Sequence, residues 1–148
     1  MWRSARERGR RTEPGQAATE FALIATALIA LIFGVVDVAY AIYAYNTVCY
    51  AASSAIRYAS LNGASSSSPA TSTSVQSLVM SLANGLNATS KCPASGAKAL
   101  CASTTFNPNN SAGSTVTIVV TYDFQPFGPF LPSAVLALSS TRQMTIPD

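Results

Sequence analysis

A long apolar run from Phe21 to Tyr45 constrains this chain more than any other feature. Of its 25 residues, 22 are apolar, and the exceptions are Thr26, Gly34 and Asp37. A helix of roughly 20 residues crosses the hydrocarbon core of a bilayer, so the run is long enough to span a membrane. No proline interrupts residues 16–62, and Asn62-Gly63 is a typical helix end. We therefore expect one helix over 16–62, with a transmembrane span at 21–45.

Charge is concentrated ahead of the apolar run. Residues 1–15 hold five of the nine basic residues and two of the six acidic ones, a net charge of +3, and the remainder of the chain is neutral. The positive-inside rule places residues 1–15 in the cytoplasm as a basic leader and residues 63–148 outside as an extracytoplasmic domain. Because the folded part carries no net charge, we expect no nucleic-acid partner.

Composition argues against catalysis. The chain has no histidine, which excludes the common Ser-His and Cys-His nucleophile systems and histidine metal sites. Six carboxylates over 148 residues leave little material for an acid/base pair or a hard-metal site. No Gly-rich phosphate loop is present. We predict a protein that is not an enzyme, with no catalytic residues, no metal and no cofactor.

Three interpretations compete for the N-terminal segment. A secretory signal would be cut after Ala41, but its apolar stretch is longer than such signals need. A plain uncleaved anchor is the second interpretation. A twin-arginine export signal fits poorly, because Arg10-Arg11 is followed by Thr12-Glu13-Pro14.

The third interpretation starts from the segment Gly15-Gln16-Ala17-Ala18-Thr19-Glu20-Phe21, directly between the basic leader and the apolar run. Its form, G-x-x-x-x-E-F, resembles the processing site of type IV pilins, and especially of the Flp/tight-adherence branch. The resemblance implies cleavage after Gly15 by a prepilin peptidase. Gln16 would then be the first mature residue and Glu20 the fifth.

Glu20 has a physical rationale of its own. A carboxylate drawn toward the bilayer centre costs about 2.5–3.5 kcal/mol. In a filament, the new α-amino group of a neighbouring subunit would neutralise Glu20, which would couple processing to assembly. The alternative is that Glu20 lies among the headgroups and stabilises the helix N-terminus, where acids are favoured.

Asp37 also has two interpretations. An acidic residue inside a span is a candidate for an intramembrane polar contact. Near the outer interface it would be structural.

The rest of the chain predicts a small α+β domain. Residues 63–74 are a Ser/Thr-rich linker, and a capping box at Thr73–Gln76 opens an amphipathic helix over about 74–86. Alternation at 115–124 predicts a strand, and 98–106 and 138–146 are weaker candidates. The fold class is therefore α+β: a long N-terminal transmembrane, pilin-like helix, a short amphipathic helix and a small antiparallel sheet. The proline-rich loop at 125–132 would cover the sheet edge or touch a partner.

Three cysteines lie on the extracytoplasmic side. Cys92 and Cys101 flank a short loop, and an oxidising compartment favours a disulfide between them over free thiols. Their spacing fits no standard zinc site. Cys49 is left over, and we expect it to be inert and buried; the alternative is a cross-link to a neighbour.

The whole pattern resembles the TadE-type minor pilins, or pseudopilins, of tight-adherence systems. The resemblance is carried by the N-terminal motif and by the segments 32–37, 55–59 and 116–124. It implies a non-enzymatic component in Flp pilus assembly and adhesion, located in the inner membrane with its N-terminus in the cytoplasm. Its partners would be a prepilin peptidase, other pilin and pseudopilin subunits, the tight-adherence membrane assembly platform and the lipid bilayer. Glu20 and Phe21 would serve subunit assembly. The rival function is an uncleaved single-pass anchor carrying an extracytoplasmic binding module.

Overall fold

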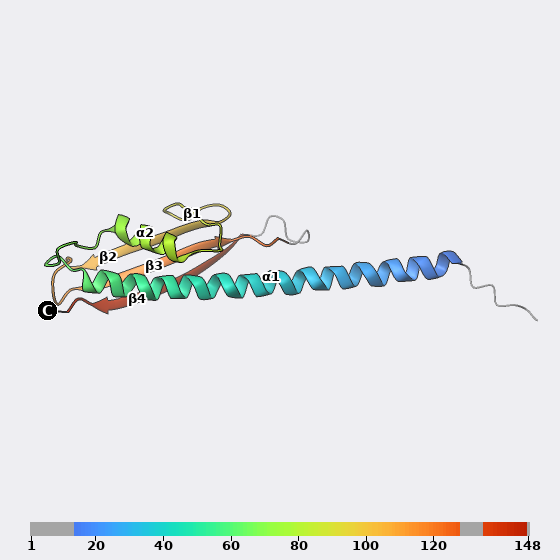
Figure 1. Cartoon of the computed structure of the whole chain (residues 1–148), viewed down its shortest axis with the longest axis horizontal. Helices are drawn as coiled ribbons and strands as arrows, with labels where there is room; N and C mark the ends of the chain where they lie inside the picture. Colours follow the sequence, from blue (N-terminus) through green and yellow to red (C-terminus); the bar gives the residue numbers. More distant parts are fainter. Residues whose placement is uncertain (1–13, 128–134, 148) are drawn as a thin grey trace, which may run out of the picture.

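The structure, a computed structural model, describes residues 14–127 and 135–147. Within them, one long helix and one short helix lie over a four-stranded sheet, which confirms the predicted α+β class (Figure 1). In chain order the elements are α1 (Pro14–Leu61), α2 (Ser72–Leu82), β1 (Thr89–Ser90), β2 (Ala99–Asn107), β3 (Thr115–Phe124) and β4 (Leu136–Thr145).

Helix α1 dominates the shape of the molecule. Its 48 residues correspond to about 72 Å at the standard helical rise. It begins at Pro14, in keeping with the preference for proline at the first helical position. It ends at Leu61, beyond which the Asn62 N–H donates to the Tyr58 carbonyl. The domain lies along the second half of α1, and the first half projects away from it (Figure 1).

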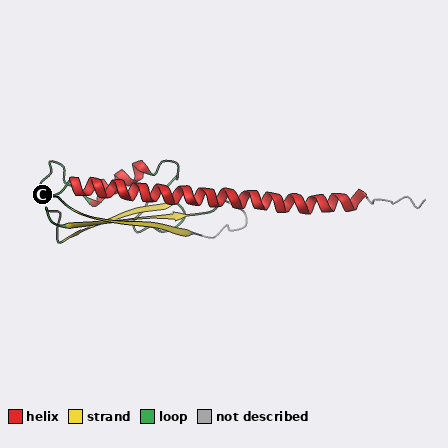
Figure 2. Ribbon diagram, turned by 90° about the horizontal axis from the view of Figure 1, so that it is seen from below, coloured by secondary structure: helices red, strands yellow, loops and turns green. Residues whose placement is uncertain are grey.

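A stripe of small residues joins α1 to the sheet. This alanine stripe consists of Ala44, Ala51, Ala52, Ala55 and Ala59, which are all buried and lie on one helix face. Four of these residues, Ala44, Ala52, Ala55 and Ala59, have no exposed surface. Alanine side chains let the helix backbone approach the sheet closely. Both helices therefore form one layer and the sheet the other (Figure 2).

Helix α2 begins earlier than the sequence predicts. The capping box is formed by Thr71 and Ser74, not by Thr73 and Gln76, and the helix covers Ser72–Leu82 instead of 74–86. The Thr71 hydroxyl accepts from the Ser74 N–H at 3.1 Å, and the Ser74 hydroxyl accepts from the Thr71 N–H at 2.9 Å. A serine at this position replaces the usual glutamate or glutamine. The Gln76 side chain therefore takes no part in the cap and can form hydrogen bonds elsewhere.

The sheet has the order β1-β2-β3-β4 and is mixed, whereas we predicted an antiparallel sheet. Strands β2, β3 and β4 are antiparallel, but β1 pairs parallel to β2. The difference arises because the loop after Ser90 returns the chain to the start of β2, so both strands run in the same direction. Two residues are too few to carry a strand signal in the sequence.

Strand β3 forms the centre of the sheet, as its alternating pattern predicts. Its core-facing side chains are buried, and they are Val116, Ile118, Val120, Tyr122 and Phe124. Strands β2 and β4 flank it in the regions predicted, with Leu100 and Leu138 opposite Tyr122. The strands run alongside α1, so one end of the sheet faces the projecting half of the helix (Figure 1).

Candidate functional site

The projecting half of α1 carries the residues singled out for processing and assembly. Gly15 and Gln16 lie in its first turn, followed one turn later by Glu20 and Phe21. All four are exposed, and a Cβ added at Gly15 would meet nothing within 4 Å. The leader residues 1–13 lie outside the described residues.

This half of α1 is apolar around its whole circumference. Exposed fractions of its large apolar side chains range from 44% at Phe33 to 74% at Leu23. In the described part of the chain, α1 is the one helix long and apolar enough to cross a membrane. A helix that is apolar all round needs an apolar environment, either lipid or other helices.

Glu20 and Asp37 occupy opposite ends of this apolar stretch. They are 17 residues apart in one helix, which corresponds to about 25 Å. The structure therefore does not combine them into one site. Each has to be considered with its own surroundings.

Asp37 contacts the far end of the chain. Its Oδ1 accepts a hydrogen bond from the backbone N–H of Phe127 at 2.9 Å. Phe127 follows β3, at the end of the sheet that faces the projecting half of α1. Its ring lies 5.1 Å from the ring of Tyr40, which in turn lies 5.5 Å from Phe124. Of the loop predicted at 125–132, residues 128–132 lie outside the described residues.

Three tyrosines, which we call the tyrosine clamp, hold one turn between the helix and the sheet. They are Tyr40 and Tyr43 of α1 and Tyr122 of β3. Their hydroxyls donate to the three consecutive carbonyl oxygens of residues 84–86, at distances between 3.1 and 3.3 Å. The clamp connects α1, the sheet and the turn after α2, because each tyrosine reaches the same short segment.

Tyr122 is the most buried member of the clamp, with 1% of its surface exposed. Burial, which would strip the phenolate of its hydration, and the adjacent Tyr40 together raise its pKa to about 12. The ordinary tyrosine pKa is 10.0. The folded protein therefore favours the neutral phenol, which can donate to the Leu86 carbonyl.

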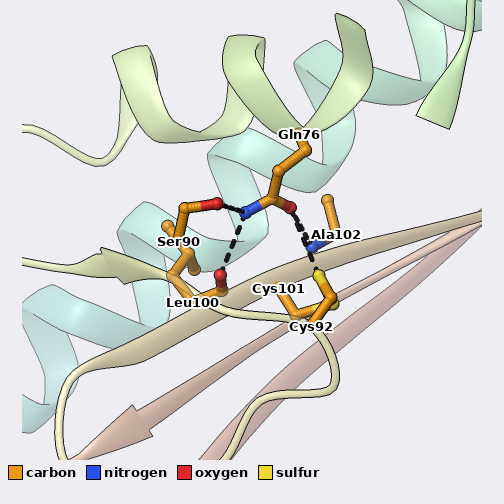
Figure 3. The surroundings of a disulfide bond; sticks show 6 residues. All are labelled: Gln76, Ser90, Cys92, Leu100, Cys101 and Ala102. Carbon is orange, nitrogen blue, oxygen red and sulfur yellow. Dashed lines mark hydrogen bonds between the residues drawn. A yellow bond between two sulfur atoms is a disulfide. The ribbon is translucent and has the colours of Figure 1, made fainter. Parts of the chain in front are cut away.

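The disulfide predicted between Cys92 and Cys101 is present, and Gln76 organises its surroundings (Figure 3). The Gln76 amide nitrogen donates to the Ser90 hydroxyl at 2.8 Å and to the Leu100 carbonyl at 3.0 Å. Its amide oxygen accepts from the Ala102 N–H at 2.6 Å. One glutamine side chain thus satisfies the backbone edge of β2 where the short β1 ends.

Cys49 is a free thiol on α1. It is half-buried, and not fully buried as we predicted. The next turn of the helix packs on the sheet, and the exposed edge of α1 at Tyr50 leaves one side of the cysteine open.

An open groove of about 760 Å³ lies beside the disulfide. Its lining combines serine and threonine hydroxyls with alanine, valine and proline side chains, and includes Gln76 and Thr104. Among residues 14–127 and 135–147, no group of three or more histidine, cysteine or acidic side chains could hold a metal ion. The groove offers hydrogen bonding and apolar contact, and its lining has no charged side chain.

Sequence reasoning missed the tyrosine clamp and Gln76. The signal for the clamp was the pair Tyr40 and Tyr43, which lie three residues apart and therefore point to the same side of a helix. Nothing in the sequence pairs Gln76 with the edge of β2.

Comparison with known proteins bears on the first half of the chain. The family model described as TadE-like protein matches residues 15–57, which confirms the resemblance predicted from the N-terminal motif. Neither the curated proteins nor the solved structures include a significant match. The matched segment begins at Gly15 and covers α1 almost to its end. The chain is therefore similar to TadE-like protein over this segment, which includes the helix long and apolar enough to span a membrane.

A substitution at Gly85 tests the tyrosine clamp. Its φ of +87° is unfavourable for other residues, and an added Cβ would lie 3.0 Å from the Tyr43 hydroxyl. Gly85→Ala should lower the free energy of unfolding by more than the about 1–2 kcal/mol expected for a left-handed alanine alone. Gly96→Ala is the matched control, because Gly96 has a φ of +88° and nothing within 4 Å. The measurement is denaturant unfolding of the full chain in detergent. Equal losses in the two variants would show that the Tyr43 hydroxyl shifts away from the added Cβ at no measurable cost, and would contradict a rigid clamp at this position.

The raised pKa of Tyr122 predicts that the protein loses stability in alkali. A group whose pKa is raised on folding stabilises the protein fully below its unfolded pKa, and this contribution disappears as pH rises through the folded pKa. The window therefore runs from about pH 10 to about pH 12. Across it, the free energy of unfolding of the wild type should fall by more than that of Tyr122→Phe, which has no phenol at this position. Parallel pH profiles would contradict the prediction.

Proposed function

We propose that the chain is a TadE-like pseudopilin that takes part, without catalysis, in assembly of a Flp/tight-adherence type IV pilus after cleavage following Gly15. Its partners are a prepilin peptidase, other pilin and pseudopilin subunits and the tight-adherence membrane assembly platform. The protein resides in the inner membrane, with its leader in the cytoplasm and its domain outside.

One observation carries the proposal: the match to TadE-like protein begins at Gly15, the glycine of the G-x-x-x-x-E-F motif. The match then continues through Glu20, Phe21 and Asp37 into the half of α1 that packs on the domain. The similarity therefore concerns the processing and membrane segment more than the sheet.

Cleavage at this position is sterically undemanding. Gly15 and Gln16 are exposed at the start of α1, away from the sheet, so a peptidase active site can approach the bond between them. Hydrolysis would leave a protonated α-amino group on Gln16. The mature helix would keep 46 of its 48 residues, from Gln16 to Leu61.

Glu20 supports assembly through charge pairing. The segment from Phe21 to Val36 contains no charged residue, so Glu20 is the first acid next to the new amino group and borders a fully apolar surface. The α-amino group of a neighbouring subunit would remove the cost of holding this carboxylate beside lipid. The exposed apolar surface of α1 would pack against equivalent helices in the filament.

The rival function is an uncleaved membrane anchor with an extracytoplasmic binding module. It assigns no role to the motif around Gly15 and requires only that α1 be apolar. The two functions differ in the mature N-terminus and in the role of Glu20.

The first prediction concerns processing. Intact mass and terminal sequencing of the protein from its native membrane should give Gln16 as the first residue. Gly15→Leu should remain unprocessed, and since nothing lies near this Cβ, its circular dichroism should be unchanged. A wild-type protein with its leader intact would favour the anchored module. A start at Ile42 would indicate a secreted protein and remove the pilin interpretation.

The second prediction concerns Glu20. Glu20→Gln keeps the shape of the side chain and removes its charge, so membrane insertion and the Gly15 cut should persist while pili are lost or sharply reduced. Glu20→Asp, which retains the charge, should assemble better than the glutamine variant. Electron microscopy of sheared pili and subunit immunoblots measure both. Wild-type piliation of Glu20→Gln would refute charge pairing.

A further inference from the structure

The end of the domain that faces the projecting half of α1 is apolar. Three large side chains are exposed there: Phe127 by 62%, Leu136 by 54% and Val135 by 48%. Phe127 follows the end of β3, and Val135 and Leu136 lead into β4, where Leu136 pairs with Phe124. We call Phe127, Val135 and Leu136 the apolar end. Soluble domains seldom gather such side chains at one end without a partner.

Contacts with α1 fix the height of the apolar end along the helix. The hydrogen bond from the Phe127 N–H to Asp37 and the ring contact between Phe127 and Tyr40 both place it beside residues 37–40. The apolar end therefore does not lie beside an arbitrary part of α1. It lies where the domain contacts end and the exposed apolar surface begins.

The length of the exposed helix agrees with a bilayer boundary at this height. A hydrocarbon core of about 30 Å takes roughly 20 helical residues. Counting back from Val36, these residues reach Ala17, at the start of the exposed half of α1. Asp37 is then the first residue outside the outer boundary, and the apolar end is level with it.

A cation lies beside the same end. The Lys98 ammonium is 6.0 Å from the centre of the Phe127 ring. A lysine with an aromatic side chain at one level is the combination found at membrane interfaces, where the ring enters the headgroup region and the ammonium meets the phosphates.

We infer that the apolar end is a lipid-contacting surface: Phe127, Val135 and Leu136 enter the outer headgroup region of the bilayer, with Lys98 at the level of the lipid phosphates. The partner is the phospholipid surface itself. Continuity with the exposed apolar half of α1 selects it over a second protein, because any bilayer that surrounds that half must reach Asp37. The span is then 17–36, shorter than the predicted 21–45, and Asp37 is an interfacial residue that positions the domain.

This inference rests on the membrane anchoring in the proposed function, but it does not depend on cleavage or pilus assembly. Tyr40, Tyr43 and Ala44, which the predicted span 21–45 includes, contact the domain.

Single-tryptophan variants test the depth of the apolar end. The native Trp2 is replaced by phenylalanine, and the full chain is placed in vesicles of phosphatidylcholine and phosphatidylglycerol brominated either near the headgroup or near the chain ends. Phe127→Trp reports on the apolar end, and its exposure makes the substitution compatible with folding. Phe33→Trp reports on the span. Leu61→Trp is the matched control, because Leu61 is 74% exposed at the end of α1, about 36 Å beyond Asp37.

We expect the indole of the Phe127→Trp variant to lose fluorescence with bromines near the headgroup and much less with bromines near the chain ends. The Phe33→Trp variant should be quenched by the deep bromines and the Leu61→Trp variant by neither set. Quenching of Phe33→Trp without quenching of Phe127→Trp would overturn the inference and leave the transmembrane span intact. Failure to quench Phe33→Trp would instead contradict the anchoring on which both proposals rest.

A second measurement distinguishes a lipid surface from a protein surface as the partner of the apolar end. In vesicles without bromine, dissolved acrylamide should quench the Phe127→Trp variant less than the Leu61→Trp variant, because lipid shields the indole at the apolar end. If the Phe127→Trp variant is protected from acrylamide and also insensitive to brominated lipid, a second protein surface covers the apolar end and the lipid assignment is wrong.

Discussion

Close packing between the alanine stripe of α1 and the inner face of the sheet is the interaction on which the rest of the structure depends. Ala52, Ala55 and Ala59 are fully buried, so the helix backbone can lie near β3 and β4 with little side-chain volume between them. The stripe gives the small sheet a second layer, which it needs in order to bury the apolar side chains of β3. A sheet of this size with one bare inner face would not be stable alone. The same helix face therefore builds the domain and connects it to the projecting half of α1.

One helix meets two environments, and its sequence changes where they meet. Up to Val36, large apolar side chains surround the helix; from Tyr40 onward, tyrosines mark the sides of a narrow alanine face. Asp37 lies at the change. Its hydrogen bond to the Phe127 N–H gives the only acid between Glu20 and Asp123 a defined structural partner.

Patterns of apolar and polar residues along the sequence predicted the helices and strands well, because each pattern indicates which face of an element is buried. The long apolar run predicted α1, and the alternation in residues 115–124 predicted β3. The end of α1 at Asn62-Gly63 followed from helix-stop chemistry. Long-range polar contacts could not be predicted in this way. Tyr122 and residues 84–86 are brought together by the fold, and Gln76 meets the edge of β2 only because α2 crosses it. The parallel strand β1 was missed for the same reason, since its two residues are paired by the return of a loop.

The length of the seam between α1 and the sheet has a mechanical consequence. Contacts extend from Asp37 to Ala59, about 33 Å along the helix axis, and the strands run alongside that axis (Figures 1 and 2). A force that draws the domain away from the projecting half of α1 along the helix axis acts parallel to this seam. The alanine stripe, the tyrosine clamp and the Asp37 contact then bear this force together as shear. They do not break one after another. Domain and helix should move as one rigid rod, and tension on the domain should reach the N-terminal end of α1 with little loss through bending.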